Sequence, residues 1–280
     1  MEKYKNLVRM DPAAALWHYT SLDAIKAILQ DRKLRLTRID TYWDDDPFEG
    51  SVPKRQIDDQ VAIFSSANTA QVESVAAHYP DMSPGIRASR FRHRDPWTQT
   101  TERRIVQARS IHVSCWSAAG ESDVMWRLYC SDGRKGCGVA LQSTFGQLEA
   151  SLAPQGVLTG QIAYRRYDDG DAFTHDLDSF FTKRSNFGIE TEVRLLKYNE
   201  RHYLQLAVAI AGEVNVSPEE LNTHIQLDWF PAEVVNRIRI SPYADEGYAT
   251  KVEDTIRSID PSMADRLDRS PLSERYPPQR

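Results

Sequence analysis

A short apolar strand leads directly into an amphipathic helix near the start of this chain. The strand ends at His18 and Tyr19, and Thr20 can cap the helix that follows. After that helix, an alternating pattern at residues 34–37 predicts a second strand, and Asp46-Pro47 then breaks regular structure. Within residues 16–50, His18 is therefore the side chain that we expect to face a ligand, and the other residues form its frame.

The rest of the chain mixes strands and helices without strict alternation. Further strands are predicted at residues 111–116, 136–142, 157–164, 189–196 and 234–240. Helices are predicted at residues 53–64, 68–78, 96–109, 173–181 and 245–259, with others opening after Ser122, Ser143 and Ser217. This order favours an α+β fold with a central mixed or antiparallel sheet flanked by helices.

The length and composition fit one folded unit. The chain has 280 residues, of which 41% are hydrophobic and 27% are charged, and this is ordinary for a globular protein. A chain of this length can bury a hydrophobic core that is large enough to be stable without a disulfide or a metal ion. We expect a single domain over residues 1–260, with a helical insertion at about 51–109. The polar, proline-rich tail at 261–280 is expected to be loose.

Charge, hydropathy and cysteine use narrow the class of function. A net charge of −5 argues against a generally basic nucleic-acid-binding protein. No apolar run approaches the roughly 20 residues of a membrane span, and the N-terminus lacks a signal-peptide pattern. Cys115, Cys130 and Cys137 are an odd number without metal-site spacing. We expect a cytoplasmic protein with reduced thiols, no metal and no membrane partner.

Residues 189–195 place charges at alternate positions of a predicted strand. Period two puts Glu190, Glu192 and Arg194 on one face, where Arg194 can hold a carboxylate by a charge-assisted hydrogen bond. A carboxylate fixed in this way can stabilise a positive charge that develops on a sugar. The alternative is a solvated face of the sheet.

The segment at residues 114–129 supplies aromatic side chains for a planar ligand. Trp126 and Tyr129 can stack on such a ligand, although helical spacing also fits core packing. Tyr19 offers a flat ring with a polar tip beside His18, and a strand pair satisfied by backbone groups is the alternative there. Cys115 is a poor candidate nucleophile because apolar strand residues surround it and no cation is visible nearby to lower its pKa.

Arginine is concentrated at residues 87–109. Seven arginines stand there against two acidic residues. Arg87, Arg90, Arg92 and Arg94, interleaved with Phe91, could grip phosphates and stack on bases. The alternative is a solvated loop that is balanced by acidic residues elsewhere.

Taken together, these motifs resemble a bacterial domain-of-unknown-function family, number twenty-nine seventy-one. The resemblance covers roughly residues 16–242 and rests on the order and spacing of several short motifs. Asp45 departs from the family pattern, which has an asparagine before Asp-Pro-Phe-Glu. The residues that carry the resemblance are 17–21, 46–49, 114–117, Met125, Trp126, Tyr129, 136–139, Lys183, Glu190, Glu192 and Arg194.

A histidine-tyrosine-threonine strand that leads into a helix is also similar to the opening of ADP-ribosyltransferases, including the toxin branch that modifies DNA. By that resemblance His18 takes the first site position, residues 114–117 the second and Glu192 the third. The Ser114-Cys115-Trp116 run departs from the Ser-Thr-Ser of that pattern. An ADP-ribosyltransferase-like split sheet is the fold that this second resemblance implies.

The resemblance implies an NAD-dependent ADP-ribosyltransferase or NAD-cleaving enzyme, a toxin or antiviral effector that acts on nucleic acid or protein. Cleavage of the bond between ribose and nicotinamide passes through a cationic sugar, which a pre-placed carboxylate stabilises. The implied catalytic residues are His18, Glu190 and Glu192. The implied NAD-binding residues are Tyr19, Thr20, Ser114, Trp126, Tyr129 and Arg194. The implied nucleic-acid-binding residues are Arg87, Arg90, Arg92 and Arg94.

Two other functions stay open. One is a non-catalytic module that binds a nucleotide or nucleic acid. The other is a hydrolase that uses Cys115 with His112 or His18, which strand geometry opposes for His112 because residues three apart point to opposite faces. The transferase hypothesis requires that His18 and Glu192 line one cleft.

Overall fold

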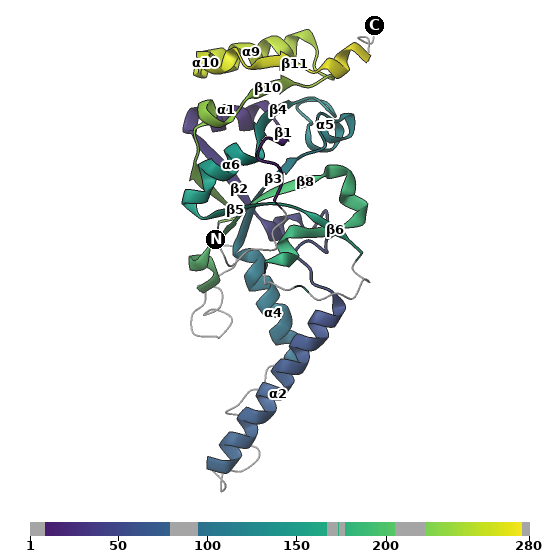
Figure 1. The fold of residues 1–280 in the computed structure, drawn as a ribbon, viewed down its shortest axis with the longest axis vertical. Helices are drawn as coiled ribbons and strands as arrows, with labels where there is room; N and C mark the ends of the chain where they lie inside the picture. Colours follow the sequence, from purple (N-terminus) through teal and green to yellow (C-terminus); the bar gives the residue numbers. More distant parts are fainter. Residues whose placement is uncertain (1–8, 79–94, 167–172, 174–176, 205–221, 276–280) are drawn as a thin grey trace.

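The computed structural model describes residues 9–78, 95–166, 173, 177–204 and 222–275, and these residues form an α+β fold. A mostly antiparallel, nine-stranded sheet lies at the centre of this part of the chain (Figure 1). Its strands are, in spatial order, β11 (Leu267–Arg269), β10 (Arg237–Ile240), β4 (Val139–Thr144), β1 (Ala15–Thr20), β3 (Ile111–Ser117), β2 (Lys33–Arg38) and β9 (His224–Asp228), with β8 (Glu192–Tyr198) pairing to β3 and to β5 (Val157–Gln161). A separate parallel pair is formed by β6 (Ala163–Arg165) and β7 (Thr182–Arg184). The predicted fold class is confirmed.

The sheet divides into a fork at β3. Strand β8 pairs with every residue of β3 along one edge. Strands β1 and β2 therefore share the other edge of β3. On that edge β1 pairs only at Trp17 with Ser117, and β2 pairs only with His112 and Val113. Between them, Nδ1 of His18 lies 2.9 Å from the backbone oxygen of Cys115. A side chain therefore bonds the backbone of β3 where the neighbouring strands diverge.

The strand register defines two faces of the sheet. Trp17 pairs with Ser117, which pairs with Glu192, so these side chains lie on one face, called the Glu192 face below. His18 lies on the other face because neighbouring residues of a strand alternate. Its ring contacts that of Trp116 at a centroid distance of 5.2 Å, and this second face is called the His18 face.

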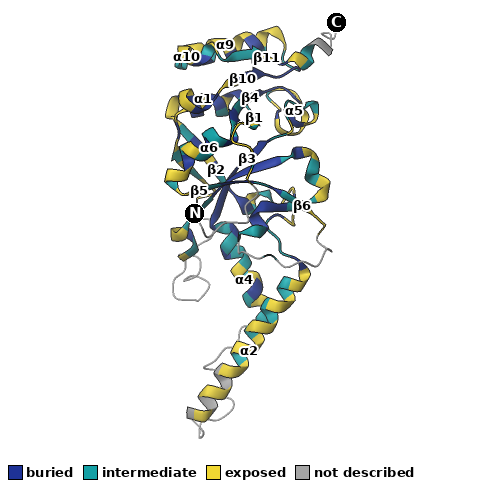
Figure 2. Cartoon of the chain, in the orientation of Figure 1, coloured by how far each residue is buried: buried dark blue, intermediate teal, exposed yellow. Residues whose placement is uncertain are grey.

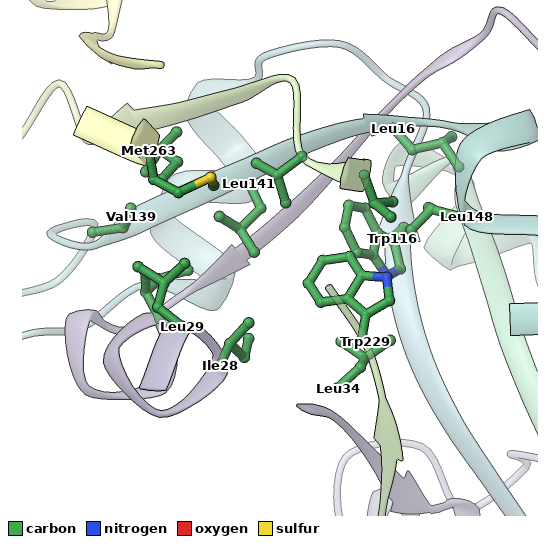
Figure 3. Close-up of a cluster of buried hydrophobic side chains, with 14 of the residues drawn as sticks. Leu16, Ile28, Leu29, Leu34, Trp116, Val139, Leu141, Leu148, Trp229 and Met263 are labelled. Atoms are coloured by element: carbon green, nitrogen blue, oxygen red, sulfur yellow. The ribbon is translucent and has the colours of Figure 1, made fainter. Parts of the chain in front are cut away.

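The larger core covers the His18 face (Figure 3). Trp116 and Trp229 meet there at a centroid distance of 6.4 Å, and Leu34 and Leu148 pack nearby. The helices that contribute buried residues to this core are α1 (Leu22–Asp31), α6 (Phe145–Leu152), α8 (Pro231–Val234), α9 (Glu246–Ile259) and α10 (Pro261–Ala264).

Two smaller clusters cover the Glu192 face, and between them lies the polar region described below. The elements on this side include α5 (Asp123–Tyr129) and the 3-10 turns η2 (Ile39–Tyr42), η4 (Asp178–Phe181) and η5 (Ser185–Glu190). Two further 3-10 turns are η3 (Ala153–Gln155) and η7 (Pro271–Arg275).

Helices α2 (Lys54–His78) and α4 (Pro96–Arg109) pack together and project from the sheet as an arm (Figure 1). Much of the surface of this arm is exposed (Figure 2). Two separate helices were expected at 53–64 and 68–78, but one continuous helix is present. Within it the hydroxyl of Ser65 donates to the carbonyl of Val61, and that of Thr69 donates to the carbonyl of Ser65. The helix accommodates these polar residues because they bond to its own backbone.

The prediction that the C-terminal tail is loose is wrong for residues 261–275. These residues form α10, β11 and η7, and β11 pairs in parallel with β10. Met263 is fully buried in the larger core. Burial of Met263 and the pairing of β11 with β10 thus hold residues 261–275 in place, although most of these residues are polar.

Several element boundaries also differ from expectation. Ser21 rather than Thr20 caps α1, because Thr20 is the last residue of β1. Thr144, the last residue of β4, rather than Ser143 caps α6. Strand β9 was not predicted, and the strand expected at 157–164 is divided into β5 and β6. The helix expected at 173–181 is reduced to η4 within the described residues. The helix expected at Ser217 lies outside them.

Candidate functional site

His18 and Glu192 lie on opposite faces of the sheet, so they cannot contact one ribose. The prediction that they line one cleft is therefore wrong. His18 is half-buried, its Nδ1 bonds to the backbone of β3, and burial lowers the pKa of its imidazole. Thr20 and Ser114 share the His18 face by strand alternation, so they too are separated from Glu192.

A continuous chain of hydrogen-bonded side chains crosses the Glu192 face. The hydroxyl of Tyr129 donates to Glu190 Oε1 at 2.6 Å. Lys183 Nζ then bridges the two glutamates, donating to Glu190 Oε2 at 2.7 Å and to Glu192 Oε2 at 3.2 Å. This set, called the charge chain below, consists in order of contact of Tyr129, Glu190, Lys183, Glu192, Arg194 and Glu49.

Arg194 links the inner end of the charge chain to a distant loop. Its Nε donates to Glu192 Oε1 at 2.9 Å, and its Nη1 donates to Glu49 Oε1 at 2.9 Å. The same Nη1 also donates to the backbone oxygen of Phe180 at 2.6 Å. The predicted contact between Arg194 and a glutamate of this segment is present, but the face is buried and not solvated. Arg194 is 1% exposed and Glu192 3% exposed.

The backbone at residues 190–192 differs from the predicted continuous strand. Glu190 ends η5, and Thr191 adopts a left-handed conformation with φ of 43° before β8 begins. Because Glu190 lies outside the strand, the alternation of strand residues does not determine where its side chain lies. It is held by Ser117, whose hydroxyl donates to the Glu190 backbone oxygen at 2.7 Å, and by the bridge from Lys183.

Burial and neighbouring charges set the protonation of the chain. Burial alone would raise the pKa of Glu192, but Arg194 and Lys183 outweigh it and lower that pKa to about 2. Burial opposes the charge of Lys183, yet Glu192 and Glu190 raise its pKa. Burial and then the charge of Glu190 raise the pKa of Tyr129, so its hydroxyl stays protonated and donates. Both glutamates therefore lie beside fixed donors.

Cys115 also faces this region. Burial and the charge of Glu192 raise the pKa of its thiol well above the ordinary value. A thiol that stays protonated is a poor nucleophile. The raised pKa of this thiol therefore gives the hydrolase alternative no support.

A partly exposed row of rings and cations continues the charge chain outward. The guanidinium of Arg184 lies 4.8 Å from the ring centroid of Phe48 and 5.3 Å from that of Phe187. Lys183 Nζ lies 4.6 Å from the same Phe187 ring. Arg184 Nη2 also pairs with Asp46 Oδ1 at 2.7 Å. This set, called the aromatic row below, consists of Phe48, Arg184 and Phe187.

The charges gathered here do not balance. Three cations face four carboxylates, so the connected residues carry one negative charge in excess. At the solvent side, Tyr129 and Phe48 are each 46% exposed. A negative excess beside exposed rings favours a ligand that carries or develops positive charge. The cations are Lys183, Arg184 and Arg194, and the carboxylates belong to Asp46, Glu49, Glu190 and Glu192.

Tyr19 of β1 and Trp126 of α5 pack against each other on the Glu192 face, between α5 and the sheet. The Tyr19 hydroxyl donates to the Gly120 carbonyl at 3.2 Å and accepts from the Ser122 backbone N–H at 3.1 Å. Its ring meets Trp126 edge-on at 4.9 Å, and both residues are buried. They position the helix that carries Tyr129 and do not offer their rings to a ligand. Arg87, Arg90, Arg92 and Arg94 lie outside the described residues.

The sequence interpretation missed part of this site. Asp46 and Glu49 were treated as scaffold, and Arg184 and Phe187 were not identified. The basic pair Lys183-Arg184, shortly before Glu-x-Glu, is a usable signal because buried carboxylates need cations. No pattern in the sequence brings Glu49 to Arg194, which is 145 positions away.

No protein-family model, curated protein or solved structure matches this chain. None of the helices in the described ranges is both long and apolar enough to cross a membrane. Within the same ranges, no group of three or more histidine, cysteine, aspartate or glutamate side chains is arranged to hold a metal ion.

Proposed function

We propose that this protein cleaves the bond between ribose and nicotinamide in NAD and passes the ADP-ribose to water or another acceptor. The form of this hypothesis that needs His18 and Glu192 in one cleft is wrong, because the two residues lie on opposite faces of the sheet. The form proposed here differs from it, since Glu190 alone acts at the reacting sugar. The observation that carries this proposal is the position of Glu190, a 6% exposed carboxylate at the outer end of the charge chain, next to the half-exposed Tyr129. The three free cysteines favour a reducing compartment such as the cytoplasm.

The proposed reaction uses the excess negative charge. The electron pair of the breaking bond leaves with the nicotinamide nitrogen, so positive charge moves from the ring to the ribose. The acceptor oxygen then bonds to the ribose, and its proton is released to bulk water. Lys183 and Tyr129 hold the Glu190 carboxylate before the reaction starts, so stabilising the sugar cation needs little reorganisation. The exposed Tyr129 ring can contact the cationic nicotinamide before cleavage.

Release of nicotinamide from NAD tests this function. The wild-type protein is expected to release it, and Glu190→Gln is expected to lower the rate by at least about 100-fold because the isosteric amide lacks the charge. Glu246→Gln is the matched control, since Glu246 is an exposed residue of helix α9 that pairs with Arg269 of the edge strand β11. Absence of nicotinamide release by the wild-type protein, or full activity in Glu190→Gln, contradicts the proposal.

A non-catalytic nucleotide-binding module is the second candidate, favoured by one observation. Each carboxylate oxygen of Glu190 and Glu192 already accepts a hydrogen bond from a side chain of the charge chain. A site built only for binding can keep those bonds when the ligand arrives. Isothermal titration that shows NAD binding without turnover, unchanged in Glu190→Gln, would select this candidate.

A further inference from the structure

We infer that Arg184 and Phe48 form a subsite for the phosphates of the nucleotide, an inference that rests on the proposed function. Arg184 is the last residue of β7 and directly follows Lys183 of the charge chain. It therefore places a second cation beside the proposed reaction site. Guanidinium groups recognise phosphate through several N–H donors in one plane.

The guanidinium of Arg184 is fixed before any ligand binds. Phe48 and Phe187 both lie within stacking distance, and Asp46 forms an ion pair with one of its nitrogens. The Arg184 side chain is 31% exposed, whereas that of Asp46 is 4% exposed. The positive group thus reaches solvent while the carboxylate that holds it stays inside. An arginine held in this way loses little side-chain freedom when it binds an anion.

The order of groups along the surface matches that of a dinucleotide. Lys183 and Arg184 both contact the ring of Phe187, so this ring lies between the Glu190 end and the Arg184 end. In NAD a single ribose joins the cationic nicotinamide to the pyrophosphate. With that ribose at Glu190, the pyrophosphate extends toward Arg184. The half-exposed Phe48 ring borders the same end and offers an apolar contact.

Isothermal titration of the full chain with two ligands tests the subsite. NAD carries the pyrophosphate, and nicotinamide riboside lacks it. Arg184→Gln is expected to weaken NAD binding by about 10- to 100-fold, the effect of losing a charge-assisted hydrogen bond, and to change riboside binding by less than about two-fold. Arg184→Lys is expected to be intermediate because it keeps the charge but loses the planar donors. Arg269→Gln, which removes an exposed pair with Glu246, is the control.

The possible outcomes separate this inference from the proposed function. If the wild-type protein binds NAD and Arg184→Gln binds it equally well, the phosphate subsite is wrong and the proposed function stands. Equal weakening of both ligands in Arg184→Gln also overturns the subsite, because it shows that Arg184 supports the site as a whole. If the wild-type protein binds neither ligand, both proposals fail. Thermal unfolding of each variant confirms that it is folded.

Discussion

Arg194 is the side chain on which the inner charge chain depends. It is buried between Glu192 and Glu49, and both carboxylates are almost fully removed from water. Such an arrangement adds little net stability relative to an apolar core, because desolvation offsets the attraction between the charges. Removal of one member has a much larger effect, since its partners keep their charges without compensation.

Replacing Arg194 with methionine is therefore expected to lower the free energy of unfolding by about 3–5 kcal/mol, measured by urea denaturation. Lys33→Met is the control, because Lys33 pairs with Asp228 at the surface, where the side chains are 41% and 74% exposed. That control is expected to lose less than about 1 kcal/mol. A similar small loss in Arg194→Met would show that the two glutamates find other compensation.

A second residue-scale effect concerns His112, which is fully buried on the His18 face. Burial lowers its pKa from 6.5 to about 4, and His202 and Arg38 lower it further, while the hydrogen bond with the Asn222 carbonyl and, less, the charge of Asp40 oppose this shift. As the pH falls through 6.5, the unfolded chain binds this proton before the folded chain does. Stability is therefore complete above 6.5 and decreases as the pH falls toward 4.

Between pH 7.5 and pH 5 this difference predicts a loss of about 2 kcal/mol in the free energy of unfolding from His112 alone. His112→Phe, which keeps a ring but cannot titrate, is expected to show a correspondingly smaller loss over the same interval. Urea denaturation of both proteins at the two pH values measures the difference. If the pH dependence is identical in the two proteins, His112 does not carry the effect.

At the scale of elements, the sequence is informative wherever one local signal decides the structure. Strand β3 and helix α9 agree with their predictions, because alternation and an aspartate cap are local properties. Glu190 shows the limit. Its position depends on the left-handed conformation of Thr191. A periodic pattern of side chains in the sequence does not indicate that one residue has a positive φ. The segment at 261–275 shows another limit, because its order comes from contacts with β10 and the larger core.

At the scale of the molecule, the sheet determines which residues can act together. Tyr129, Glu190, Glu192 and Arg194 were predicted as site residues, and the structure joins them in one chain of contacts. His18 was predicted with them, but the register between β1 and β3 turns it to the other face. That register is a property of strand pairing over a long sequence separation. A one-residue shift would reverse it, and this is why the sequence alone could not decide the question.

The separation of the two faces leads to opposite expectations for His18 and Glu190. His18→Leu removes the bond to the Cys115 carbonyl at the fork, and leaving this partly buried carbonyl unsatisfied is expected to lower the free energy of unfolding by about 1–3 kcal/mol. Because His18 does not face the charge chain, folded His18→Leu is expected to keep nicotinamide release within about three-fold of the wild-type rate. That change corresponds to less than 1 kcal/mol in activation free energy.

Glu190→Gln is expected to do the reverse, since it removes a charge at the proposed reaction site but keeps a side chain of the same shape. Its release of nicotinamide falls while the fold persists. Measuring release and urea denaturation on the same preparations makes the comparison direct. If His18→Leu is folded yet inactive, His18 reaches the reaction and the division of function between the two faces is wrong. If His18→Leu loses stability but keeps nicotinamide release, and Glu190→Gln does the reverse, then His18 stabilises the fold at the fork. The reaction then takes place on the face that carries Glu190.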